Sequence, residues 1–229
     1  MTTPRNPRYF PPAESANEDG LVLFGGRLSP DWLLDAYRHG IFPWPIFEDA
    51  SLLAWWSPDP RAIIEFEEFH IPRSLHRICR SGKFQLTCNR AFAQVIHGCA
   101  NVPDRRGKTW LSDQMIAAYL ALHELGHAHS VEAWYDDTLA GGVYGVSVGG
   151  LFAAESMFFR VADASKVALV ALVEHLRVRG YKLLDIQQLT EHTQRFGARE
   201  ISRRMYLKRL AAAIELPVTF GKLVGSGDV

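Results

Sequence analysis

The pattern of apolar and polar positions predicts four helices before residue 126, each ended by a glycine. The first begins at Ser29-Pro30, because serine caps a helix and proline fits its first turn, and it ends at Gly40. The other three helices are predicted at Pro72 to Ser81, Asn89 to His97 and Ser112 to Leu125.

Later in the chain the pattern changes to that of strands. Three antiparallel strands are expected in succession, followed by a helix, a strand and two short helices: Ser130 to Trp134, Leu139 to Val148, Leu151 to Phe158, Ser165 to Arg179, Tyr181 to Gln187, Glu191 to Phe196 and Arg203 to Ile214. This order predicts the α+β class, with a mostly antiparallel mixed sheet and flanking helices. Prolines and tryptophans are dense near the start, so we expect a small N-terminal domain at 1–60 and a larger domain at 61–229.

Composition is typical of a globular protein with a core of good size. The chain has 229 residues, of which 48% are hydrophobic, and Lys+Arg equals Asp+Glu at 25 each. These values exclude a disordered chain, a coiled coil and a collagen-like fibre, and they argue against coating nucleic acid through bulk charge. No apolar run approaches the roughly 20 residues that cross a bilayer, and the polar start is unlike a signal peptide, so we expect a cytoplasmic protein.

A short motif raises the possibility of a zinc protease. His123-Glu124-Leu125-Gly126-His127 fits the His-Glu-x-x-His pattern, in which two imidazoles share a metal and the glutamate activates water. However, Ala133 occupies the position where a metzincin has its third histidine. Gly126 would also end the helix between the two histidines, and this structural reading of the motif is the alternative.

An acyl-coenzyme A transferase is a second possibility, because acetyltransferase-like domains share this order of three antiparallel strands, a long helix and a strand. Such enzymes hold pyrophosphate on backbone amides at a helix N-terminus. The corresponding loop, Arg160 to Ser165, contains no glycine, and Asp163 would repel the pyrophosphate. The sequence therefore favours the fold of these enzymes without their coenzyme.

Basic residues are unevenly distributed although the net charge is zero. Residues 69–103 contain no Asp or Glu, and Arg73, Arg77 and Arg80 recur there on one helix, joined by Lys83 and Arg90. A second basic stripe consists of Arg195, Arg199, Arg203, Arg204, Lys208 and Arg209. Each stripe is either a solvated helix face or a surface that holds RNA phosphates.

Aromatic and polar residues mark two candidate binding regions. Trp44 and Trp110 lie in segments rich in proline or glycine, where each ring either packs in the core or stacks on a base. Glu155, Asp185 and Gln187 interrupt apolar strands, and residues 185 and 187 of one strand point to the same face. Buried polar groups need partners, which either a structural network or a bound substrate supplies.

At these residues the chain resembles the leucyl/phenylalanyl-tRNA–protein transferases. The matching segments are Gly40 to Trp44, Trp55 to Arg61, Leu122 to Ser130, Gly141 to Gly145, Glu155 to Phe158, Ala164 to Lys166 and the segment around Asp185 and Gln187. The His-Glu-x-x-His string lies inside one of them, in a family that binds no metal. The resemblance thus opposes the protease hypothesis.

The resemblance implies transfer of Leu or Phe, and Met more weakly, from an aminoacyl-tRNA to a protein that begins with Arg or Lys. This forms a peptide bond and tags the protein for degradation under the N-end rule. The implied fold is a small N-terminal domain plus an acetyltransferase-like (GNAT-like) domain, without metal or cofactor, and we expect a monomer that does not bind membranes.

The resemblance also assigns site residues. Trp44 and Trp110 would hold the terminal adenosine, and Asp185 and Gln187 would activate the amine, with Asp185 either a base or an orienting group. The aminoacyl side chain and the basic N-terminal residue would meet a group of pocket residues: Val143, Phe152, Glu155, Leu172, Leu176, Leu184 and Ile186. We expect Arg73, Arg77, Arg80 and Lys83 to bind the tRNA body through phosphates.

Overall fold

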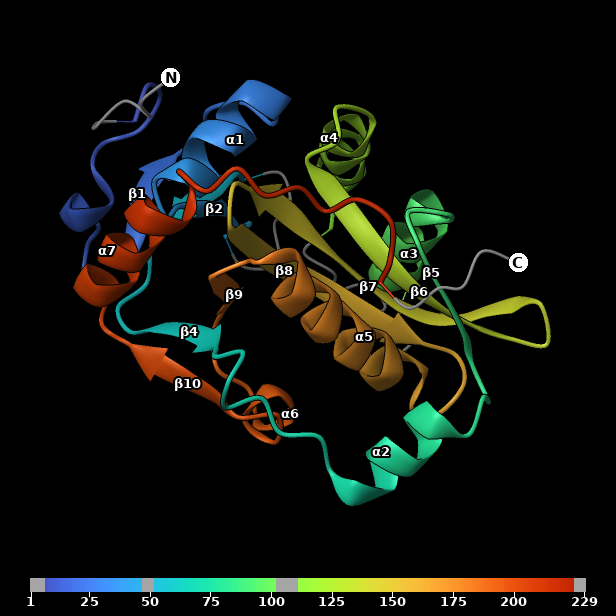
Figure 1. Ribbon diagram of the computed structural model, residues 1–229. Coiled ribbons are helices and arrows are strands. Elements are labelled where there is room, and N and C mark those ends of the chain that lie inside the picture. Colours follow the sequence, from blue (N-terminus) through green and yellow to red (C-terminus); the bar gives the residue numbers. More distant parts are fainter. Residues whose placement is uncertain (1–6, 47–51, 102–110, 225–229) are drawn as a thin grey trace.

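The computed structural model describes residues 7–46, 52–101 and 111–224, and its centre is a seven-stranded mixed sheet (Figure 1). The strand order is β10-β4-β9-β8-β7-β6-β5. The strands are β4 (Arg61–Ile64), β5 (Gln85–Cys88), β6 (Ala128–Tyr135), β7 (Thr138–Val148), β8 (Leu151–Phe159), β9 (Leu183–Gln187) and β10 (Ala198–Ile201). Among the described strands β8 and β9 alone pair in parallel, which confirms the expected mixed, mostly antiparallel sheet.

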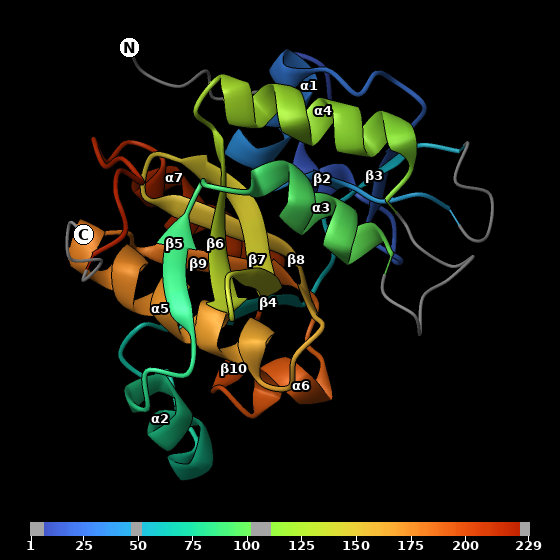
Figure 2. The ribbon, with the colours of Figure 1, turned by 90° about the vertical axis from the view of Figure 1, so that its right-hand side faces the viewer.

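Helices cover both faces of this sheet. The helix α5 (Ala164–Arg179), which connects β8 to β9, packs along β6 and β7 on one face. The opposite face is covered by α3 (Phe92–Ala100) and α4 (Asp113–Glu124), as Figure 2 shows. The remaining helices are α1 (Pro30–Arg38), α2 (Arg73–Arg80), α6 (Glu191–Gln194) and α7 (Arg203–Ala213). Each face thus has its own cluster of buried apolar side chains.

The N-terminal part forms a second, three-stranded sheet beside the first. Its order is β1-β3-β2, with β1 (Leu21–Phe24), β2 (Phe42–Pro43) and β3 (Ala54–Trp56). Trp55 is fully buried and contacts the Phe10 ring at a centroid distance of 4.8 Å. Trp32 of α1 closes this aromatic group, 5.2 Å from Phe10. Phe10 and Trp55 belong to the same core cluster as residues of α3 and α4, and Trp32 packs against it, so the small sheet shares a core with these helices.

The segment after α7 returns to the face covered by α5 and forms a C-terminal strap, residues 217–224. Phe220 is buried, stacks on His129 at 4.3 Å and lies 5.7 Å from the Phe152 ring. His175 holds the strap through both ring nitrogens, since Nε2 lies 2.8 Å from the Phe220 carbonyl and Nδ1 accepts from the Val224 amide at 3.1 Å. The strap therefore closes one end of the buried layer under α5.

Two differences from the predicted elements have clear causes. Gly98 was expected to end a helix, but it lies inside α3, where a Cβ would approach the Phe158 ring to 2.7 Å. This glycine serves close packing rather than termination. The strands β4, β5 and β10 were not predicted, because each has only four residues and lacks strong alternation of apolar and polar positions. Within the described residues, no helix is long and apolar enough to cross a membrane.

Candidate functional site

The large sheet splits between β8 and β9. These strands pair over three positions, from Leu151 opposite Leu183 to Ala153 opposite Asp185. Beyond that point β8 continues along β7, whereas β9 continues along β4. The residues of β8 from Ala154 to Met157 are consequently partly exposed, although they lie in the middle of the sheet. The split exposes strand residues that a continuous sheet would cover.

A β-bulge lies on each side of the split. On β8, Ala154 pairs with Gly145 and Ser156 pairs with Tyr144, so Glu155 is the extra residue. On β9, Asp185 and Gln187 pair with consecutive residues of β4, so Ile186 is the extra residue. Gln187 has a φ of 59°, a left-handed conformation that costs energy for a residue other than glycine. Bulges redirect side chains, and here they allow those of Glu155 and Gln187 to meet.

Glu155 is the centre of a hydrogen-bond chain across the split. Its Oε1 accepts from Nε2 of Gln187 at 3.1 Å, and its Oε2 accepts from the Tyr119 hydroxyl at 3.0 Å. Tyr119 in turn lies 2.7 Å from the hydroxyl of Tyr37, which α1 contributes. Burial raises the pKa of Glu155 to about 7, although both tyrosines act in the opposite direction. The site thus contains a carboxylate that exchanges a proton near neutral pH.

Asp185 is fully buried, and both of its carboxyl oxygens accept two hydrogen bonds each. Its carboxylate accepts from Nε and Nη2 of Arg61 at 2.9 and 2.7 Å, from the Tyr206 hydroxyl at 2.8 Å and from the Gln187 amide at 3.0 Å. Burial alone would lower the pKa of Arg61, but the charge of Asp185 more than offsets this and raises it above its usual value. Arg61 therefore stays charged beside Asp185, and the carboxyl group of Asp185 fixes the backbone of Gln187.

The structure brings the predicted apolar residues together. Five of them belong to one buried cluster between the sheet and α5: Val143, Phe152, Leu172, Leu176 and Leu184. Ile186, the bulged residue of β9, packs against this cluster and is partly exposed. The cluster thus borders the split at which Glu155 and Gln187 meet.

The two predicted tryptophans have different outcomes. Trp44 follows β2 and is 41% exposed, and its carbonyl accepts from the Trp56 indole at 2.9 Å. Its side chain is thus far more exposed than that of the fully buried Trp55. Trp110 lies outside the described residues.

The helix α2, which contains Arg73, Arg77 and Arg80, lies at the end of the molecule opposite to α1 and α4, as both ribbon views show. Arg73, Arg77, Arg80 and Lys83 are exposed, and none of them forms an ion pair with a described residue. The second stripe differs, because Glu65 accepts hydrogen bonds from Arg199 at 2.6 Å and from Arg209 at 2.5 Å. The surface of α2 thus keeps its uncompensated positive charge.

The residues behind the two alternative hypotheses have structural partners. His123 stacks on Phe92 at 4.2 Å and bonds the Ala128 carbonyl through Nδ1. His127 follows Gly126, whose φ of 77° ends α4, so the two histidines do not share a helix face. Asp163 precedes α5 and forms an ion pair with Lys166 at 2.8 Å. This acid occupies the end of α5 at which an acetyltransferase would bind pyrophosphate.

Four residues of the site were not predicted, namely Arg61, Tyr37, Tyr119 and Tyr206. Arg61 had a signal in the sequence, because an aspartate within the apolar strand Leu183–Gln187 requires a cationic or hydrogen-bonding partner. Arg61 lies directly before the apolar run Ala62 to Ile64, where such a partner could have been sought. The tyrosines come from α1, α4 and α7, and their convergence depends on the tertiary structure.

Comparisons with known proteins identify the family of the chain. The leucyl/phenylalanyl-tRNA protein transferase family matches residues 63–211, and the N-terminal domain of the same family matches residues 26–59. A protein of that name from Magnetococcus marinus is 51% identical over 217 residues, covering 93% of this chain and 91% of the relative. Another, from Enterobacter sp., is 51% identical over 203 residues, covering 88% and 85%.

The comparison of structures finds a more distant resemblance. The structure of L-PGS from Bacillus licheniformis matches with a TM-score of 0.45 and 11% identity, covering 68% of this chain and 65% of the other. The two family matches together span most of the chain, and they include both strands of the split and the segment of Trp44. The chain therefore belongs to the leucyl/phenylalanyl-tRNA–protein transferase family, and it is a transferase.

Proposed function

We propose that this transferase moves Leu or Phe, and Met less efficiently, from an aminoacyl-tRNA to the α-amine of a protein that begins with Arg or Lys. In this proposal the enzyme acts as a cytoplasmic monomer, and the added residue tags the protein for degradation. The observation that carries it is the contact between Glu155 and Gln187 across the split in the sheet, beside a buried apolar cluster. The pKa of Glu155 at this contact is raised to about 7.

The reaction needs little chemical assistance. An aminoacyl ester is already activated, and its conversion to an amide is downhill. The attacking α-amine has an ordinary pKa near 7.7–8.0, so part of it is neutral at cellular pH. Holding the amine against the ester therefore supplies much of the acceleration, and a base adds about 10²–10⁴.

Glu155 is suited to contact the incoming N-terminus. As a carboxylate it attracts the cationic Arg or Lys, and its raised pKa allows it to take a proton from the attacking amine near pH 7. The Gln187 amide, fixed by the backbone bulge, orients the Glu155 carboxylate. The burial and full pairing of Asp185 support the orienting role for this residue rather than that of a base, since a base needs a free lone pair.

The apolar cluster is the proposed site for the Leu or Phe side chain. It is bounded by Phe152 and Leu184 of the strands and by Leu172 and Leu176 of α5. An apolar pocket discriminates by about 1–3 kcal/mol per methylene, so selection against smaller side chains is graded. Large unbranched side chains are accepted together.

The nucleic acid is proposed to bind at two places. Trp44 and Trp110 hold the terminal adenosine, and stacking of this kind contributes about 1–3 kcal/mol per base. The exposed cations Arg73, Arg77, Arg80 and Lys83 contact phosphates of the tRNA body. A tRNA is long enough to reach both ends of the molecule.

One assay tests the proposal directly. The enzyme is mixed with Phe-tRNA carrying labelled phenylalanine and with a peptide that begins with Arg, and label on the peptide is the expected result. A peptide that differs only in beginning with Glu is the matched control and should stay unlabelled. Labelling of both peptides would contradict the acceptor specificity, and labelling of neither would contradict the transfer itself.

A further inference from the structure

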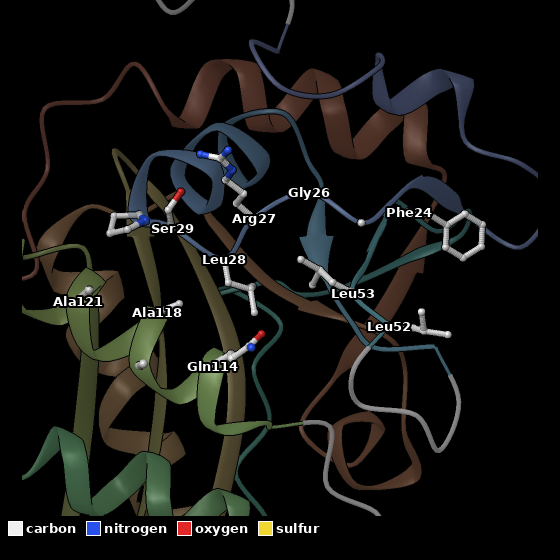
Figure 3. Close-up of a pocket in the computed structure, with 13 residues that line it drawn as sticks. Phe24, Gly26, Arg27, Leu28, Ser29, Leu52, Leu53, Gln114, Ala118 and Ala121 are labelled. Atoms are coloured by element: carbon white, nitrogen blue, oxygen red, sulfur yellow. The ribbon is translucent and has the colours of Figure 1, made fainter.

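A second concave site lies beside the small sheet of β1, β2 and β3. Its volume is about 700 Å³, and it lies between the small sheet and α4 (Figure 3). Phe24 lines it from β1, Leu52 and Leu53 line it from the segment before β3, and Gln114 and Ala118 line it from α4. Arg27, in the loop that joins β1 to α1, lies at the edge of the same space. Sites of this size and largely apolar lining are typical of small-molecule or nucleotide binding.

Phe24 and Trp44 are related by the register of the small sheet. Phe24 pairs with Ala54, and the Trp44 amide donates to the carbonyl of the same Ala54 at 2.9 Å from the other side. Residues opposite each other on neighbouring strands project to one face. The two aromatic rings therefore flank Ala54 on the same face, and both are exposed, Phe24 by 62% and Trp44 by 41%.

The spacing of the backbones of Phe24 and Trp44 suits two bases. Two strand intervals of about 4.8 Å separate their backbones by roughly 10 Å. One base held between two rings needs about 7 Å, because each contact is near 3.5 Å. A backbone separation of roughly 10 Å leaves room for a separate base against each ring, and so for two successive bases.

The charge at the site indicates which substrate enters it. Arg27 is exposed and makes no hydrogen bond or ion pair with any described residue. Its cation would repel an acceptor protein that begins with Arg or Lys, and it would attract a phosphate. Gln114 is exposed and offers both a donor and an acceptor, as recognition of a base edge requires.

We propose that this site binds the nucleotide that precedes the terminal adenosine of the aminoacyl-tRNA, with its base on Phe24 and its phosphate at Arg27. The inference rests on the proposed function, because it takes Trp44 as the site of the terminal adenosine. It adds a single-stranded nucleotide subsite, formed by β1, the following loop and α4. Binding there would extend the contact with the 3′ end and leave the reacting ester unaffected.

Two aminoacyl donors distinguish an effect on the subsite from an effect on the reaction itself. Transfer to a peptide beginning with Arg is measured from Phe-tRNA and from 3′-phenylalanyl-adenosine, which lacks the preceding nucleotide. The variants Phe24→Ala and Arg27→Gln should raise KM for Phe-tRNA about tenfold and leave both KM and kcat for the short donor unchanged. The control is Leu125→Ala, which removes an apolar side chain that is 61% exposed at the end of α4.

A binding measurement keeps the inference testable if transfer itself fails. The trinucleotide CCA and adenosine are titrated against the intact protein, with tryptophan fluorescence as the signal. Phe24→Ala should weaken CCA binding about tenfold and leave adenosine binding unchanged, and Arg27→Gln should reduce the salt dependence of CCA binding. Equal effects on both ligands or both donors, or no effect of Phe24→Ala on either, would overturn the subsite. Absence of transfer by the unaltered enzyme would overturn the proposed function instead.

Discussion

Gln187 donates to Glu155 at 3.1 Å across a gap in the sheet where no backbone hydrogen bonds join β8 to β9. Both residues reach this contact through bulges, and the backbone of Gln187 is in turn bound by the carboxylate of Asp185 at 3.0 Å. The pair Arg61–Asp185 thus acts on the site through Gln187. This relationship separates a group that exchanges protons from groups that position it.

The pH profile should identify Glu155 as the titrating group. Its pKa is raised to about 7, so the carboxylate form, which accepts a proton, increases as the pH rises through 7. We expect kcat/KM to rise there, with a second rise near 8 from the substrate amine. Glu155→Gln should lower kcat/KM by about 10²–10³ and remove the first rise only. Persistence of that rise in Glu155→Gln would assign it to another group.

The pair Arg61–Asp185 should show strong coupling in unfolding experiments. Arg61→Met leaves a buried carboxylate without its counter-ion, and the expected loss is about 3–5 kcal/mol in the free energy of unfolding. The double variant Arg61→Met with Asp185→Leu should lose less than Arg61→Met alone. Urea unfolding of the two single variants and the double variant measures this, and additive losses would show that the two residues act independently.

The surface of α2 should control the salt dependence of tRNA binding. Arg77→Glu is expected to weaken binding and to reduce the slope of log K against log salt by about one to two units, because phosphate contacts release counterions. Arg199→Glu is the matched control, since Arg199 already pairs with Glu65. Titrations at several salt concentrations provide the slopes, and an unchanged slope for Arg77→Glu would exclude Arg77 from the tRNA interface.

Gly98→Ala should destabilise the protein although alanine favours helices. The added Cβ would lie 2.7 Å from atoms of the Phe158 ring, which is buried, and overpacking of this kind costs about 1–3 kcal/mol. Replacing the ring with a smaller side chain, by Phe158→Leu, should reduce the loss of stability caused by Gly98→Ala. Thermal unfolding of the two single variants and the double variant tests this, and a stabilised Gly98→Ala would contradict the tight contact.

The C-terminal strap should make stability depend on pH. Burial lowers the pKa of His129 to about 4 and also lowers that of His175. Below pH 6.5 the unfolded chain takes up protons that the folded protein excludes, so this part of the stability is complete above pH 6.5 and is lost as the pH falls toward 4. His129→Phe keeps an aromatic ring against Phe220, and it should reduce the slope of the free energy of unfolding against pH. Urea unfolding between pH 7.5 and 5 gives the comparison, and identical slopes would exclude His129.

The elements with strong local signals were predictable from the sequence. Helix α1 has its serine before Pro30 and α4 its Ser112 cap, which accepts from the Met115 amide at 3.3 Å. The long strands β7 and β8 and the helix α5 lie within a few residues of their predicted bounds. Short strands such as β4 and β10 owe their existence to pairing partners more than 100 residues away, which no local pattern contains.

The site was predictable in its parts but not in its connections. Glu155 and Gln187 were identifiable as polar residues in apolar strands, but the bulges that bring them together depend on how β8 and β9 separate. Asp185 appeared equally suited to accept a proton or to orient its neighbours. Arg61 is buried beside it, with its guanidinium 4.6 Å from the ring centres of Phe42 and Tyr206. This buried partner favours the orienting role for Asp185, and it depends on tertiary packing.

The strap that follows α7 also touches the wall of the proposed aminoacyl pocket, because Phe220 lies against Phe152. Residues at the far end of the chain can thereby adjust the depth of that pocket without meeting either substrate. Substitutions in the C-terminal strap could therefore change the preference of related enzymes among large amino acids, without any change at Glu155 and Gln187.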